Sequence, residues 1–232
     1  MNSEKEFRIK WSAGSLYAGG ADTTVLSIYA FFKAMALHPE VAAEAQAEID
    51  SVVGSNRLPS FADREDLPFV NALVSEVLRW QAVVPAPPHV VKEDDLHDGF
   101  LIPKGTIIIP NIWKMLHDSR TYSNPMTFNP KRFLGPYPEL DPRKISFGFG
   151  RRQVFLINLA RRVLADASIF VSCAMTLAVF NISKYVDESG QVIEPVVDQT
   201  TGTVSHPTPF QCSIKPRSQK ALLLINAEIT KA

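Results

Sequence analysis

Residues 147–170 read FGFGRRQVFLINLARRVLADASIF, a glycine-rich segment followed by an apolar one. In the first segment, Gly148 and Gly150 stand between aromatic and basic residues and let the backbone turn tightly or approach a flat ligand closely. From Ile157 onward, apolar residues recur at helical spacing, which predicts a buried helix. A basic, glycine-rich loop that enters a buried helix suits a cofactor with negative groups. Because such turns are common before helices, the pattern alone favours an ordinary turn.

The charge balance and the cysteine content exclude several classes of function. The 232 residues include 24 Lys+Arg and 24 Asp+Glu, so the net charge gives no reason to expect nucleic acid or an anionic membrane as a partner. The two cysteines, Cys173 and Cys212, lie in apolar runs and predict small buried side chains rather than a disulfide framework. The most apolar run, residues 169–180, is shorter than the roughly 20 residues that span a bilayer, so we expect no membrane anchor in this chain.

Two interpretations of residues 11–37 are open. An apolar pattern covers this segment, but two adjacent glycines interrupt it, and a glycine inside a helix costs about 1 kcal/mol relative to alanine. The helix could begin with Asp22 or Thr23 as its N-cap, and periodicity favours this interpretation. It could instead be one long helix, opened locally at the glycines, that aims a carboxylate and a hydroxyl into a pocket. Residues 1–12 would form a polar lead-in.

Glu76 and Arg79 form a candidate ion pair on a helix predicted to begin after Leu67. Their spacing of three residues places both side chains on one face of that helix. Apolar neighbours indicate that the pair is buried, and a buried ion pair usually needs a third partner.

Turn signals and apolar runs predict several further elements. We expect a helix from Pro39 to a stop at Gly54, a short helix over 113–117, and strands over 106–110, 184–186, 191–193, 212–214 and 222–225, the last two in a closing hairpin.

Four motifs resemble those of the cytochrome P-450 family of haem-thiolate monooxygenases, in the family's order. Residues 19–24, GGADTT, are similar to the oxygen-activation motif, and Glu76 with Arg79 matches the Glu-x-x-Arg motif. Arg132, in the segment FNPKRF, matches the arginine that completes this pair into a triad. The stretch at 147 resembles the haem-binding loop Phe-x-x-Gly-x-Arg-x-Cys-x-Gly, in which the matching residues are Phe147, Gly150 and Arg152.

The resemblance covers nearly the whole chain and implies the C-terminal half of the P-450 fold, mostly α with small β-sheets (α+β). We expect one truncated domain over residues 1–232, with a helical haem-side core at 13–180 and a C-terminal β-hairpin region at 181–232. The resemblance also favours the single long helix over an N-cap at Asp22. Because the family's N-terminal half is missing, we expect exposed apolar surface and association with another chain.

Each motif implies a role for its residues. Asp22 would supply protons, and Thr23 would hold dioxygen and water by hydrogen bonds. Haem would be bound by His89, Phe147, Gly150 and Arg152, with His89 at a propionate. The structural triad, which locks the chain that leads to the haem loop, would be Glu76, Arg79 and Arg132. The residues expected to line the substrate pocket are Val84, Pro85, Thr208, Pro209 and Phe210.

The sequence departs from the family at the haem ligand. The position of the ligand cysteine is Val154, and that of the motif's last glycine is Leu156. In the family, the cysteine thiolate bonds the iron and its electron donation favours cleavage of the oxygen–oxygen bond, whereas valine has no donor atom. Gln153 offers only a neutral amide, and Cys173 lies about five turns further along the helix. We therefore expect no metal ligand at this position, no thiolate ligation and impaired monooxygenation.

The sequence thus predicts a protein related to haem-dependent monooxygenases of small lipophilic substrates, secondary metabolites among them, that is catalytically impaired in this form. Haem is the expected cofactor, and an active form would need a lipophilic substrate and a redox partner. One alternative is a non-catalytic remnant that binds a hydrophobic ligand or a protein partner, and another is a damaged gene product that folds only in part. With no anchor in this chain, a soluble form would be cytoplasmic.

Overall fold

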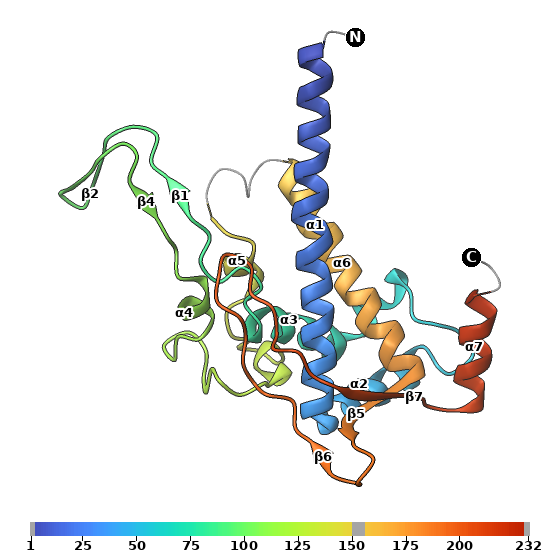
Figure 1. Ribbon diagram of the computed structural model, residues 1–232. Helices are drawn as coiled ribbons and strands as arrows, with labels where there is room; N and C mark the ends of the chain where they lie inside the picture. Colours follow the sequence, from blue (N-terminus) through green and yellow to red (C-terminus); the bar gives the residue numbers. More distant parts are fainter. Residues whose placement is uncertain (1–2, 150–155, 230–232) are drawn as a thin grey trace.

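A long helix, α1 (Ser3–Leu37), spans most of the height of the molecule, and the other elements gather around its C-terminal half (Figure 1). This computed structural model describes residues 3–149 and 156–229. Helices α2 (Pro39–Val52), α3 (Pro68–Trp80) and α6 (Leu156–Val179) pack around that half of α1. The fold is mostly α-helical with small antiparallel sheets, which confirms the predicted fold class.

The helix α1 continues without interruption through Gly19 and Gly20. The interpretation with an N-cap at Asp22 is therefore wrong, and the expected polar lead-in forms the first turns of the helix. The Thr23 hydroxyl donates a hydrogen bond to the Gly19 carbonyl, four residues earlier, at 2.9 Å. Such a bond from a threonine to the preceding turn is compatible with a continuous helix.

The hydrophobic core lies between the C-terminal half of α1 and helices α2, α3 and α6. Phe31 from α1, Leu73 from α3, and Phe170 and Leu177 from α6 are fully buried there. The burial of one such side chain contributes about 1.5–3 kcal/mol to stability. The buried helix predicted after residue 157 is confirmed for the C-terminal part of α6, where Phe170 and Ala174 are fully buried. It is wrong for the preceding turns, because Val163 and Leu164 of the same apolar pattern are 55% and 69% exposed.

Residues 89–108 form an arm that projects from one side of the body (Figure 1). At its base β1 (His89–Val90) pairs antiparallel with β4 (Ile107–Ile108), and between them in the chain β2 (Asp95–His97) and β3 (Phe100–Ile102) form a hairpin. The remaining short elements of the described chain are η1 (Phe61–Asp66), α4 (Ile112–Leu116), η2 (Pro130–Phe133) and α5 (Arg143–Ser146).

The C-terminal region differs in part from the prediction. Strand β5 (Phe180–Val186) pairs with β6 (Val192–Ile193) on one side, and strands were expected in both segments. On its other side β5 pairs with β7 (Cys212–Pro216), so the closing hairpin expected between 212–214 and 222–225 is wrong. The predicted strand at 222–225 is wrong, because this segment lies in helix α7 (Gln219–Ile229). The Ser218 hydroxyl accepts a hydrogen bond from the Ala221 amide at 3.1 Å and caps the helix, and its alanine, leucine and lysine residues favour helix over strand.

Between β6 and β7 the chain reverses direction in a further hairpin, which we call the 198–208 hairpin. The Thr208 amide donates to the Asp198 carbonyl at 3.1 Å, and the Thr200 amide donates to the His206 carbonyl at 2.8 Å. The fully buried Ser205 closes the tip, because its hydroxyl donates to the Thr200 carbonyl at 2.8 Å. In the described part of the chain, no helix is both long and apolar enough to cross a membrane.

Candidate functional site

The structure places Glu76, Arg79 and Arg132 together in the protein interior. Glu76 and Arg79 are each 0% exposed, and the Arg79 guanidinium donates two hydrogen bonds to the Glu76 carboxylate at 2.7 and 2.8 Å. Arg132 approaches the same carboxylate at 3.2 Å through its Nε and pairs with Glu139 at 2.7 Å through a terminal nitrogen. Two buried cations therefore share one buried carboxylate, and a second carboxylate balances the charge.

The remaining donors of the triad bond to backbone carbonyls, so the network leaves no cation alone. Arg79 donates to the carbonyls of Leu116 and Pro125 at 2.9 and 2.7 Å. The Asn129 amide donates to the Glu76 carboxylate at 2.7 Å. Buried ionic groups cost much less when each donor has a partner, and a network of this kind fixes the segments that supply those partners. The triad thus ties α3 to the chain between α4 and η2.

A second ionic network holds the segment immediately before the glycine-rich loop. Asp166 on α6 accepts from Arg143 on α5 at 2.6 Å and from Arg64 in η1 at 2.5 Å. Arg143 also donates to the Ser75 hydroxyl on α3 at 3.0 Å. These residues connect α5 to α3 and α6, and no motif in the sequence indicated them. Asp166 and Arg64 are 102 residues apart, and no local pattern marks such a contact.

The described part of the glycine-rich loop begins as α5 ends. Phe147 is the residue after α5 and packs against the main core, and the Gly148 amide donates to the Ile145 carbonyl at 2.9 Å. Gly148 has φ +80°, a left-handed conformation that glycine adopts without strain. The predicted cofactor-binding residues Gly150 and Arg152, and the position of Val154, lie outside the described residues. Phe147 therefore has the place expected for it beside the loop, and its haem contact stays a prediction.

Asp22 and Thr23 lie on α1 near its middle and face different partners. The Asp22 carboxylate is exposed and lies 3.9 Å from His206 Nε2 of the 198–208 hairpin. The Thr23 side chain is half-buried, and its hydroxyl is bonded to the Gly19 carbonyl. Acid and hydroxyl are thus adjacent, as the sequence predicts, but no described group joins them into one hydrogen-bonded unit.

The predicted substrate-pocket residues lie in two segments that the structure brings to the same side of α1. Val84 and Pro85 are half-buried, and the Pro85 carbonyl accepts from the Trp113 amide at 3.2 Å. The Phe210 amide donates to the Tyr29 hydroxyl on α1 at 3.2 Å, and the two rings lie 4.8 Å apart. His89, by contrast, is exposed on β1, and its Nδ1 lies 3.2 Å from the Pro87 carbonyl. The substrate and propionate roles of these residues stay predictions.

The two cysteines of the chain do not suit an iron-bound thiolate. Cys173 is fully buried in the core, and burial raises the pKa of its thiol well above the ordinary range. Cys212, at the start of β7, also has a thiol pKa that burial raises. Among residues 3–149 and 156–229, no cluster of three or more His, Cys, Asp or Glu side chains could hold a metal ion. With valine at position 154, the donor set of this chain does not fit haem held by a cysteine thiolate.

The fold and motifs define the class of this protein. The family model for cytochrome P450 matches residues 5–211, and the chain belongs to the cytochrome P450 family. The identification made from the four motifs is therefore confirmed. The family binds haem and carries out monooxygenase chemistry, which makes haem the cofactor that membership implies.

Individual relatives are cytochrome P450 monooxygenases. The chain is 58% identical to cytochrome P450 monooxygenase 208 of Postia placenta over 228 residues, which cover 97% of this chain and 43% of the relative. It is 51% identical to cytochrome P450 monooxygenase claR of Ampulloclitocybe clavipes, over 94% of this chain and 40% of the relative. It is 47% identical to cytochrome P450 monooxygenase CLM2 of Gibberella zeae, over 98% of this chain and 42% of the relative. The chain thus spans about two fifths of the length of these curated relatives.

Proposed function

We propose that this chain is the haem-side part of a protein related to monooxygenases of small lipophilic substrates, and that monooxygenation is impaired because the ligand sulfur is absent. The observation that carries the proposal is the donor set. Val154 stands at the ligand position, Cys173 is enclosed in the hydrophobic core, and Cys212 lies in a strand. Without a thiolate, the electron donation that favours oxygen–oxygen bond cleavage is lost.

The surrounding scaffold supports descent from an active enzyme. The buried triad around Glu76 is fully hydrogen-bonded, and Asp166 ties the segment before the loop to α6. Asp22 and Thr23 lie side by side on α1, where a carboxylic acid and a hydroxyl suit proton delivery. An active form of this lineage would take a lipophilic substrate and receive electrons from a redox partner.

A second candidate function is non-catalytic binding of a protein partner. The observation that favours it is a set of large apolar side chains exposed on the N-terminal half of α1, which are Phe7, Ile9, Trp11 and Tyr17. Haem titration of the purified chain separates the two candidates. Stoichiometric binding with a Soret band supports the enzyme lineage, and an absence of binding supports the non-catalytic function.

The ligand position is tested with the variant Val154→Cys. The purified chain and the variant are loaded with haem and reduced under carbon monoxide, after mass spectrometry of the peptide has verified residue 154. We expect the thiolate-type difference spectrum in the variant alone. The matched control is Val163→Cys, which adds a thiol at an exposed position further along α6. A thiolate-type spectrum from the unaltered chain, or organic hydroxylation with dioxygen and a reductant, would overturn the proposal.

A further inference from the structure

Three polar side chains on one face of α1 contact the 198–208 hairpin and its C-terminal end. Asp22, Tyr29 and Lys33 are separated by seven and then four residues, close to two turns and one turn of helix, so their side chains line up along the same face. Asp22 lies 3.9 Å from His206, the Tyr29 hydroxyl accepts from the Phe210 amide, and Lys33 Nζ donates to the Asp198 carbonyl at 2.9 Å. Figure 1 shows the chain between β6 and β7 lying alongside α1.

Lys33 is the unusual member of this row. Its side chain is only 1% exposed, yet in the described part of the chain it forms no ion pair with a carboxylate. Burial lowers the pKa of the Lys33 ammonium, and the nearby charge of Asp198 offsets part of that effect. A lysine is costly at a buried position unless its ammonium interacts with something specific. A hydrophobic residue of similar length would fill the same space without that cost, so packing alone does not explain Lys33.

The hydrogen bond from Lys33 is not required to satisfy its acceptor. The Asp198 carbonyl already accepts from the Thr208 amide within the hairpin, at 3.1 Å. A second bond to the same carbonyl adds little to the pairing of the hairpin itself. It does fix where the base of the hairpin lies along α1, because Lys33 belongs to a rigid helix.

The opposite side of the hairpin is held by the segment after α3. The Ser205 amide donates to the Val83 carbonyl at 2.8 Å, and the Gln81 side chain donates to the Gln199 side-chain oxygen at 2.7 Å. The hairpin therefore lies between α1 and the segment that contains Val84 and Pro85. Asp22, Tyr29 and Lys33, which contact the hairpin and its C-terminal end, all lie on one face of α1.

We propose that Lys33 and Tyr29 are positioning residues that hold the 198–208 hairpin against α1, so that residues 208–210 keep a fixed place beside the helix face that carries Asp22. The substrate-facing role of residues 208–210 rests on the proposed function. The anchoring does not, because all of its contacts lie within the described chain. Its test needs neither haem nor substrate, so a failure of the anchoring is distinguishable from a failure of the proposed function.

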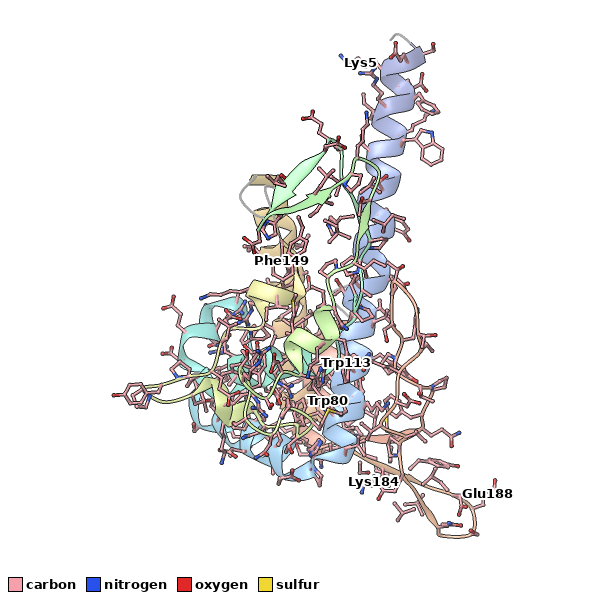
Figure 2. The ribbon with its side chains drawn as sticks, turned by 90° about the vertical axis from the view of Figure 1, so that its left-hand side faces the viewer. Lys5, Trp80, Trp113, Phe149, Lys184 and Glu188 are labelled. Carbon is pink, nitrogen blue, oxygen red and sulfur yellow. The ribbon has the colours of Figure 1, made fainter. Side chains whose placement is uncertain are left out.

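The test is hydrogen–deuterium exchange of the hairpin amides, followed by mass spectrometry. In Lys33→Met, we expect the segment 198–210 to exchange about tenfold faster, the factor expected for the loss of one hydrogen bond from a charged donor. Exchange in the buried part of α3 should not change. In Tyr29→Phe, which keeps the ring and removes the acceptor, we expect faster exchange only near Phe210. The matched control is Lys5→Met, since Lys5 lies at the far end of the same helix, away from the packed body around Trp80 and Trp113 (Figure 2).

Each other outcome counts against the proposal. Unchanged exchange of the hairpin in a folded Lys33→Met chain shows that the lysine does not position it. A uniform rise in exchange over the whole chain, or a failure to fold, shows that Lys33 supports the core in general. In that case Tyr29→Phe still tests the contact between the hairpin and α1. Equal exchange near Phe210 in this variant and in the unaltered chain would show that Tyr29 does not position this segment either.

Discussion

At the scale of single residues, the surroundings of His117 make the free energy of unfolding depend on pH. It follows α4, its ring stacks on Trp113 with 4.5 Å between centroids, and its Nδ1 lies 2.9 Å from the Trp113 carbonyl. Burial lowers the pKa of His117 below its ordinary value of 6.5. The hydrogen bond to Trp113 opposes this shift, and the positive charges of Arg79 and Lys114 add to it. The folded protein therefore favours the neutral imidazole.

A loss of stability on acidification follows from this shift. Below pH 6.5 the unfolded chain takes up a proton at His117 while the folded chain does not, so the free energy of unfolding falls as the pH decreases from 6.5 toward the lower folded pKa. We expect His117→Asn to show a smaller decrease over this range, measured by urea unfolding at several pH values. The control is His97→Asn, because His97 is exposed on β2. Equal pH dependence of His117→Asn and the unaltered chain would contradict this account.

At the scale of elements, the ion triad connects α3 with η2 and the segment before it. The single carboxylate of Glu76 faces the guanidinium groups of both Arg79 and Arg132. Replacement of Glu76 leaves the two buried cations with Glu139 as the one carboxylate of this network, and Glu139 pairs with Arg132. Since the removal of one partner from a buried ion pair strands an uncompensated charge, the contact between α3 and η2 depends on this carboxylate.

We expect Glu76→Gln to lower the free energy of unfolding by about 3–5 kcal/mol, the range for a broken buried ion pair. The measurement is urea unfolding followed by circular dichroism. The matched control is Glu44→Gln, which removes an exposed carboxylate paired with Lys131 at 2.9 Å and should cost less than about 1 kcal/mol. A Glu76→Gln chain as stable as the Glu44→Gln chain would show that the triad does not hold these elements together.

Helices were more predictable from the sequence than the C-terminal elements. Apolar periodicity with Pro39 and Pro68 at first positions located α2 and α3, because these signals are local. Periodicity alone placed the start of α1 wrongly at Asp22, since two glycines reduce helix propensity without breaking the helix. The run Leu222 to Ile225 resembled a strand because four consecutive apolar residues fit both periods, and the cap at Ser218 decides for helix.

The contacts of the candidate site could be predicted only between residues that belong to a recognisable sequence motif. The Glu-x-x-Arg pair and Arg132 have recognisable surroundings in the sequence, so their meeting was expected. The contacts of Asp166 with Arg64 and Arg143 join three separate elements and leave no local signal. The same applies to Lys33, whose partner Asp198 is 165 residues away. Such contacts depend on how helices pack, which a single sequence does not specify.

At the scale of the whole molecule, the two halves of α1 have different surroundings. The C-terminal half contributes Phe31 and Met35 to the core, whereas the first turns of the N-terminal half extend beyond the rest of the described chain (Figure 1). Two exposed ion pairs between residues four positions apart, Arg8 with Glu4 and Lys10 with Glu6, stabilise the helical conformation of this extended half. It nevertheless carries Phe7 and Trp11 in contact, with ring centroids 5.9 Å apart and Trp11 63% exposed.

Apolar side chains exposed together on one helix favour association, because their contact with another molecule removes them from water. We expect the purified chain to self-associate with rising concentration and the double variant Phe7→Glu, Trp11→Glu to shift toward monomer, as measured by sedimentation velocity. The control is Tyr137→Glu, since Tyr137 is 94% exposed in a loop between η2 and α5 and far along the chain from α1. This control should associate as the unaltered chain does. A monodisperse monomer at every concentration would show that the extended half of α1 does not drive contact between copies, and an equal effect of Tyr137→Glu would assign the change to added charge rather than to the helix face.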